Sequence, residues 1–344
     1  MQKKLLFAVF GITMILGATE LFAQRGRAQA EVLEVRLGSP LPRESPWGRT
    51  LDRIAAEWNR ITNGQVRLNI RHGGIEGTEA RMHMALASDT IQAAVLTSFG
   101  LSLIDPAIMT LTVPFLIRNE REMDAVMREI QGDLETRLNS GNYFMLAWSR
   151  AGFVNIFSRD PVSTPDDLRR LRIASNPEAS EANTAFRTMG FQIFEADWND
   201  VGNRLNAGTV TAIYNNPAAV AAFQLHTILR NMLSTNIAPV VGGIVMNQVT
   251  WRRIGELNPR FQQELMTATR RIAEDFDRTL QNDIDRAIQT MTRAGLRVNR
   301  PTAAQEQLWF GEIERALPNL LGTVYDRDLY NRINNTLIRF RAGR

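Results

Sequence analysis

The sequence contains no cysteine among its 344 residues. Disulfide bonds, thiol chemistry and lipid attachment through an N-terminal cysteine are therefore excluded. A chain without cysteine suits an oxidising compartment, although the absence of one residue type is weak evidence for a location.

The sequence is also poor in the residues and motifs of catalytic and metal sites. It has three histidines, His72, His83 and His226, which lie far apart along the chain. It has no His-Glu-x-x-His motif, no Gly-x-x-x-x-Gly-Lys-Ser/Thr phosphate loop and no Gly-x-Ser-x-Gly nucleophile turn. An enzyme needs a nucleophile, a base or a metal held in place. We therefore expect a protein that is not an enzyme and that has no metal or cofactor.

Long apolar runs are missing except near the N-terminus. Lys3 and Lys4 precede an apolar run from Leu5 to Ala18, and a polar stretch then ends in Ala28-Gln29-Ala30. This order is typical of a secretory signal peptide that is cleaved after Ala30, with Ala23 as a second candidate site. The alternative is an uncleaved anchor, but the run is shorter than the roughly 20 apolar residues that span a bilayer. We expect residues 1–30 to be removed and the protein to be periplasmic.

The charge balance argues against an acidic polymer as partner. The sequence pI is 9.9, but removal of residues 1–30 takes four basic residues from 40 and one acidic residue from 36, which leaves +1. The remaining basic residues are all arginine, whose high pKa raises the pI without creating a basic surface. These arginines are interleaved with acidic residues, so we expect no binding to nucleic acid.

After residue 30 the chain alternates strand and helix patterns, which is typical of α/β architecture. About 314 residues are more than one hydrophobic core usually supports. We therefore expect two lobes, the first from residues 31–151 and 242–280 and the second from 152–241 and 281–344. Strands are expected at 32–37, 66–70, 91–96, 143–148, 171–174, 192–194, 210–213 and 237–246.

Three helices have clear sequence signals. Ser45-Pro46 caps and starts a helix that runs to Ile61, and Thr164 to Asp167 form the start of another, with an acid at the third position. The longest helix starts at Asn258-Pro259, and its apolar residues recur every three or four positions until Gly295. About 36 residues at 1.5 Å each give about 54 Å, so we expect this helix to pack against both lobes.

Several short stretches occur together in an order and spacing that mark a family: Ser45-Pro46-Trp47-Gly48, Thr62-Asn63-Gly64, Val113-Pro114-Phe115-Leu116, Ser163 to Leu168, and Leu205 through Gly208 to Asn215-Asn216-Pro217. From about Val32 to about Ala273 the chain resembles the DctP-type periplasmic binding subunits of TRAP (tripartite ATP-independent periplasmic) transporters. The resemblance implies a periplasmic-binding-protein fold of two α/β lobes, joined by crossing strands and a long helix that spans both. It also implies a small ligand in the cleft and delivery to the membrane subunits of a transporter.

The resemblance places the ligand site on a set of residues spread over both halves of the chain: Trp47, Thr97, Ser98, Phe99, Val154, Asn155, Ala174, Trp198, Tyr214, Asn215 and Asn216. Family members usually carry an arginine that grips a carboxylate, and this position falls on Ala174. A second arginine of some acid-binding members falls on Val154. Apolar walls with few polar groups suit a weakly polar ligand. We expect a neutral or largely hydrophobic ligand.

Other functions stay open at this stage. A binding protein of an ATP-driven importer shares the two-lobe plan, and an extracytoplasmic sensor or interaction module would signal to a partner instead of delivering cargo. Adjacent genes for a four-helix and a twelve-helix membrane protein would favour the TRAP interpretation over the importer. Some members of the resembled family associate with helical-repeat periplasmic proteins, which adds such a protein to the candidate partners.

Overall fold

The computed structural model describes residues 32–343, so the expected signal peptide and its cleavage site lie outside the described residues. The strands form one ten-stranded sheet in the order β2-β1-β3-β9-β4-β7-β5-β6, with β8 paired to β4 and β10 paired to β8. Their bounds are β1 Leu33–Gly38, β2 Val66–Arg71, β3 Ala93–Thr97, β4 Tyr143–Ser158, β5 Arg172–Ser175, β6 Gln192–Glu195, β7 Ala212–Asn215, β8 Asn231–Leu233, β9 Ala238–Asn247 and β10 Arg297–Asn299.

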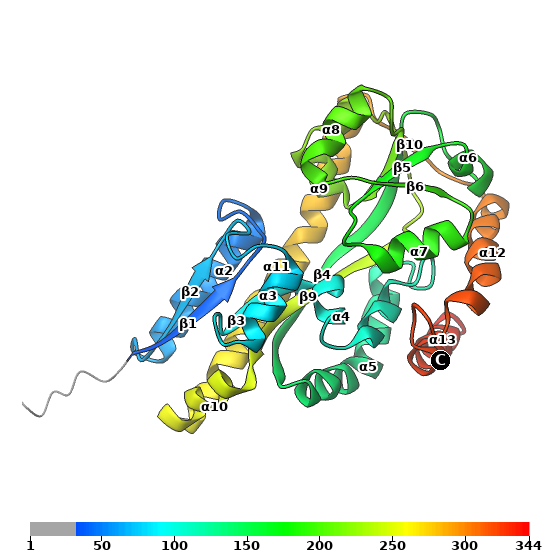
Figure 1. The fold of residues 1–344 in the computed structure, drawn as a ribbon. Helices are drawn as coiled ribbons and strands as arrows, with labels where there is room; N and C mark the ends of the chain where they lie inside the picture. The colour runs from blue at the N-terminus through cyan, green and yellow to red at the C-terminus, as the bar shows by residue number, and fades with distance from the viewer. Residues whose placement is uncertain (1–31, 344) are drawn as a thin grey trace, which may run out of the picture.

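Strand direction divides the sheet into two lobes (Figure 1). In the first lobe β1 pairs in parallel with β2 and β3, and in the second lobe β5 pairs in parallel with β6 and β7. The two long strands β4 and β9 run antiparallel to each other and join the lobes: β9 pairs with β3, and β4 pairs with β7. This architecture confirms the predicted two-lobed α/β fold, while the assignment of the later segments to one lobe or the other stays a prediction.

The strand β4 is much longer than its sequence predicts. The pattern predicts an end at Trp148, whereas β4 continues to Ser158 and shifts its register against β9 between Arg150 and Phe153. Gly152 lies inside this shift with a φ of +76°. A bulge of this kind interrupts the two-residue alternation of side chains, and for that reason the second part of β4 does not extend the pattern of the first.

Helices cover both faces of the sheet and fill the ends of the two lobes. They are α2 Pro46–Ile61, α3 Glu79–Ala87, α4 Ser98–Ser102, α5 Glu120–Ser140, α6 Pro165–Arg169, α7 Ser180–Thr188, α8 Trp198–Asn206, α9 Pro217–Ala222, α10 Gln248–Leu257, α11 Pro259–Arg293, α12 Ala303–Leu320 and α13 Arg327–Arg341, with short 3-10 turns at Pro106–Thr112 and Leu225–Thr227. The capping box predicted at α6 is confirmed: the Thr164 hydroxyl accepts from the Asp167 N–H, and the Asp167 carboxylate accepts from the Thr164 N–H. The helix α9 ends at Ala222, and Gln224 two residues later adopts a left-handed conformation.

The long helix α11 spans both lobes, as its sequence predicts. Asn258 caps its N-terminus by accepting from the Arg260 N–H at 3.0 Å, and Gly295 follows its end with a φ of +99°. Its 35 residues extend over about 52 Å at 1.5 Å each. It packs against α2 and α10 in the first lobe, against the joining strand β4 and against α9 in the second lobe, and Figure 1 shows it passing behind the sheet in yellow and orange.

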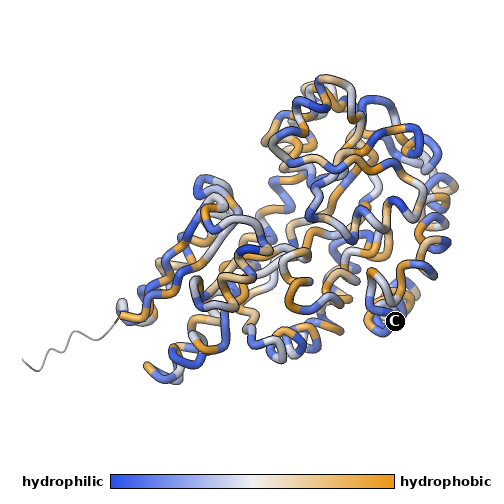
Figure 2. The backbone as a smooth tube through the Cα atoms, viewed as in Figure 1, coloured by the Kyte–Doolittle hydropathy of each residue, from blue (hydrophilic) through white to orange (hydrophobic). Residues whose placement is uncertain are grey.

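Apolar side chains from the two faces of the sheet form separate cores. Trp58 of α2 is fully buried against β1, β2 and α11, and its indole N–H donates to the Thr269 hydroxyl at 2.9 Å. A second core gathers Phe157, Ile213 and Val220 under α8 and α9. Figure 2 shows the outer helices alternating between hydrophilic and hydrophobic segments, which is the pattern of amphipathic helices on a core. Within residues 32–343, no helix combines the length and apolar character needed to cross a membrane.

Candidate functional site

Strand direction brings the carboxyl ends of both parallel sets toward the joining strands. Thr97, the last residue of β3, pairs with Gly242 of β9, which pairs with Ser149 of β4. Asn215, the last residue of β7, pairs with Asn155 of β4. The carboxyl ends of β3 and β7 are therefore separated along β4 by residues 149–155, which span about 20 Å at 3.3 Å per residue. Open α/β sheets bind ligands beyond the carboxyl ends of their strands. We call the region between residues 97–99 and 214–216 the interlobe site.

On the first lobe, the interlobe site is built around a carboxylate that the sequence reasoning missed. Glu79, the first residue of α3, accepts from the Thr97 N–H at 2.9 Å, from the Thr97 hydroxyl at 2.9 Å and from the Gly100 N–H at 2.9 Å. These bonds fix the turn from β3 into α4, and they leave Thr97 exposed and Ser98 and Phe99 half-buried. Glu79 reads in the sequence as an ordinary first-turn acid after the Thr78 cap, and only the fold shows that it reaches the end of β3.

The Glu79 carboxylate gives this side of the site a negative character. Burial raises its pKa, and the negative charge of Glu178 on the second lobe raises it further, whereas the hydrogen bonds from Thr97 and Gly100 lower it. The two acids therefore interact across the lobes. A second carboxylate that entered this part of the site would meet both charges and would find the Thr97 and Gly100 N–H groups already occupied.

On the second lobe, the predicted site residues are largely bound to their own neighbours. The Tyr214 hydroxyl lies 2.6 Å from the Ser175 hydroxyl and donates to Asn183 at 3.2 Å. The Tyr214 ring stacks on Phe186 with 4.8 Å between the ring centres, and burial raises the pKa of Tyr214. Ala174 is only 2% exposed and lies in the core beneath α8 and α9. Trp198 begins α8, and its side chain is outside what the structure describes.

Between the lobes, β4 and α9 meet through buried amides. Asn155 donates to the carbonyls of Leu233 and Thr235 at 3.3 and 3.1 Å. Asn216 caps α9 by accepting from the Ala218 N–H at 2.8 Å, and it donates to the Ala151 carbonyl at 2.7 Å. The neighbouring Asn215 stays half-buried, with its side-chain oxygen 2.7 Å from the Asn216 N–H. Val154 is half-buried and packs against a hydrophobic cluster that includes Phe153 and Ile156.

Trp47 joins the two lobes through α11. Its ring lies 4.3 Å from that of Phe276, and it packs with Ala151 and Ala218 against an apolar strip of α11 that includes Leu280 and Ile284. Of the predicted site residues, Trp47 itself packs on this strip, together with Ala151 and Ala218, which were not predicted but lie within three residues of the predicted Val154 and Asn216. Asn155 and Pro217 also line a pocket of about 820 Å³ on the α11 side of β4, a size within the range of small-molecule sites.

The arginines that flank the site in sequence are engaged elsewhere. Arg172 donates to the carbonyls of Thr209, at 2.7 Å, and of Gly208. Arg204 pairs with Asp200 at 2.6 Å on the exposed face of α8. Among the described residues, no group of three or more His, Asp or Glu side chains is arranged to hold a metal ion.

Comparison with known proteins gives a consistent family. The family model for bacterial extracellular solute-binding protein, family 7 (DctP), matches residues 37–321. The 2,3-diketo-L-gulonate-binding periplasmic protein YiaO of Escherichia coli is 23% identical over 239 residues, which are 69% of this chain and 72% of that protein.

Solved structures of TRAP periplasmic solute-binding proteins share the fold. The Ralstonia eutropha protein with bound (S)-2-acetolactate superposes with a TM-score of 0.79 at 18% identity, covering 89% of this chain and 99% of that one. The Chromohalobacter salexigens protein with bound D-glucuronate gives a TM-score of 0.78 at 18% identity and covers 88% of this chain and 99% of that one.

Proposed function

Because the chain belongs to the bacterial extracellular solute-binding protein family 7 (DctP), we propose that it captures a small organic solute between its lobes in the periplasm and delivers it to the membrane subunits of a TRAP transporter. The observation that carries this proposal is the convergence of the carboxyl ends of β3 and β7 on the joining strand β4. The solved relatives are TRAP proteins, which favours this function over service to an ATP-driven importer. Export by cleavage after Ala30 and a helical-repeat partner stay predictions.

The solute that fits this site best is neutral or largely hydrophobic. The relatives bind organic acids: diketogulonate, acetolactate and glucuronate. In this chain alanine and valine occupy the positions, Ala174 and Val154, where the resemblance expects arginines. A carboxylate that leaves water loses hydration worth several kcal/mol, and only a paired cation recovers that loss.

Two features of the interlobe site add to this argument. Arg172 and Arg204 already have partners: Arg172 donates to the Thr209 carbonyl and Arg204 pairs with Asp200. Glu79 and Glu178 repel an anion at the first-lobe end. The apolar surface of Trp47 and Phe99 would hold the solute at roughly 25 cal/mol per Å² buried. A single polar end would find the exposed Thr97 or the half-buried Ser98 and Asn215.

The ligand class is tested by calorimetry with the mature protein. Titration with D-glucuronate, 2,3-diketo-L-gulonate and (S)-2-acetolactate is expected to give no binding heat, because each carboxylate lacks a cation in the site. The variant Val154→Arg serves as the comparison, because Val154 is half-buried and an arginine there restores one of the two expected cations; it should gain affinity for at least one of these acids. Micromolar binding of any of the three acids by the unmodified protein would overturn the proposed ligand class.

A further inference from the structure

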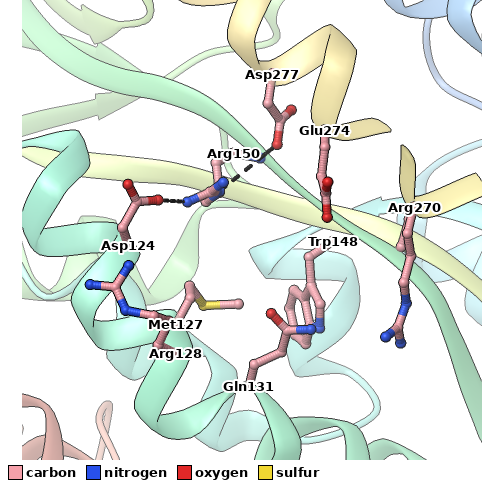
Figure 3. A pocket seen from close by; sticks show the side chains of 10 residues that line it. Asp124, Met127, Arg128, Gln131, Trp148, Arg150, Arg270, Glu274 and Asp277 are labelled. Carbon is pink, nitrogen blue, oxygen red and sulfur yellow. Dashed lines mark hydrogen bonds and ion pairs between the residues drawn. The ribbon is translucent and has the colours of Figure 1, made fainter. Parts of the chain in front are cut away.

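A buried carboxylate ties the joining strand β4 to the long helix. Asp277 of α11 accepts from the Ser149 hydroxyl at 2.9 Å and from the Arg150 N–H at 3.0 Å. The Arg150 guanidinium lies 3.9 Å from Asp277 and pairs on its other side with Asp124 of α5. Figure 3 shows Arg150 between these two acids, which come from different helices. We call Asp124, Ser149, Arg150 and Asp277 the hinge clamp.

The clamp lies where β4 must bend when the lobes move. Arg150 is the last residue before the register shift that ends at Phe153, and Gly152 within it has a φ of +76°. A change in the angle between two lobes is absorbed by a few backbone torsions in the segments that join them. Asp277 holds two consecutive residues of this segment, one by its side chain and the next by its N–H, so it fixes the strand at the start of the bend.

The charge of Asp277 is costly in free energy at this position, because the side chain is buried. Its side chain is 10% exposed, and burial raises its pKa to about 6 despite the hydrogen bonds and the nearby charge of Arg150. An uncharged acceptor such as asparagine would accept hydrogen bonds from Ser149 and Arg150 without the cost of a buried charge. Stability alone therefore does not account for the carboxylate, and residues kept against stability are expected at functional positions.

The charge on Asp277 can respond to the surrounding solution. With Asp124 and Arg150 it lines a pocket of about 210 Å³, and one water needs about 30 Å³. The charged groups that face it are Arg150 of β4, Glu120, Asp124 and Arg128 of α5, and Glu274 and Arg278 of α11. Arg278 is paired with Asp275, and Arg270, which also lines the pocket, is paired with Glu135 at 3.1 Å. Arg150 is the cation that lies within ion-pair distance of Asp277, at 3.9 Å.

We propose that the hinge clamp positions the two lobes: with Asp277 charged it holds β4 in the bend described here, and loss of that charge loosens the bend and changes the angle between the lobes. The clamp contacts belong to this conformation, and an interaction made in one of two states biases the equilibrium toward that state. Asp277 is charged above its pKa, so the clamp is strongest at neutral pH and weakens as the pH falls toward 5. This proposal does not depend on the class of solute.

Interlobe distance in the ligand-free protein tests the proposal, because the absence of cysteine allows selective labelling. Spin labels at Ala56→Cys on α2 and Asn203→Cys on α8 occupy exposed positions in the two lobes, and pulsed electron paramagnetic resonance measures the distance between them. Between about pH 7.5 and about pH 5, the distance distribution of the protein with Asp277 intact should shift away from its neutral-pH position. Asp277→Asn should show the shifted distribution at both pH values.

Asp283→Asn is the matched control, since it removes an acid from the same helix that pairs only with Arg286; it should keep the original distribution and its pH response. Ser149→Ala removes a single hydrogen bond and should give an intermediate shift, which keeps the test available if Asp277→Asn folds poorly. The proposal is overturned if the pH response persists in Asp277→Asn, or if the distance does not change with pH in the unmodified hinge.

Discussion

Replacing Gly152 with valine is expected to lower the free energy of unfolding by about 3 kcal/mol. A β-branched residue is strained at a φ of +76°, at a cost of roughly 1–2 kcal/mol. A Cβ at this position would also lie 2.6 Å from the Cδ1 atom of Ile284, and overpacking of a buried contact adds about 1–3 kcal/mol. Because this atom is the end of the Ile284 side chain on α11, that side chain would have to leave its place in the apolar strip at the bend of β4.

Chemical denaturation at equilibrium measures this effect, with Gly132→Ala as the control. Gly132 lies on the exposed face of α5, where an added Cβ would have open space around it. Alanine there should be neutral or stabilising by up to about 1 kcal/mol, because glycine is a poor helix residue. If Gly152→Val unfolds with the same midpoint and slope as the unmodified protein, the close approach of β4 to α11 at residue 152 is wrong.

Trp58→Ala should lower the free energy of unfolding by about 3–5 kcal/mol, the range for loss of a fully buried aromatic side chain. Trp58 is 0% exposed and bridges α2 to α11 within the first lobe. Its removal also leaves the Thr269 hydroxyl without the indole donor. The loss of stability should be greatest in the first lobe. Hydrogen exchange of amides in β1 and β2 should therefore accelerate more than exchange of amides in β5 and β7.

Trp58→Phe separates the contribution of the buried aromatic surface from that of the indole hydrogen bond, because it keeps most of the apolar surface and removes the N–H donor. It should cost about 1–2 kcal/mol, the usual range for a lost hydrogen bond with some loss of packing. Equal acceleration of exchange in both lobes of Trp58→Ala would show that the lobes unfold as one unit. A loss below about 1 kcal/mol would contradict the burial of this indole.

Local signals in the sequence predict α2, the start of α6 and α11, and all strands except β8 and β10. α2 and α11 each begin with a capping residue followed by proline, and their apolar faces repeat every three or four residues. Such signals depend on neighbours within one or two turns, so the sequence carries them directly. The second half of β4 lacks such a signal, because the register shift between Arg150 and Phe153 breaks the alternation on which strand prediction depends.

The site is less predictable than the fold, because its residues meet only through long-range pairing. Thr97 and Asn215 were expected at strand ends, and the structure places both at the carboxyl ends of their strands. Glu79 and Asp277 have no distinguishing sequence signal, since an acid in the first turn of a helix or on a polar helix face is common. Their partners lie 18 residues away at Thr97 and 127 away at Arg150, and a helical pattern does not encode such separations.

The most direct test of the central claim, that the interlobe site holds a neutral or largely hydrophobic solute, is native mass spectrometry of the mature protein purified without added ligand. We expect a population with one retained small molecule, which fragmentation identifies as lacking a carboxylate, because alanine and valine occupy the two positions where the resemblance expects arginines, and Arg172 and Arg204 have other partners. Retention of a carboxylic acid in the place of such a molecule would contradict the account.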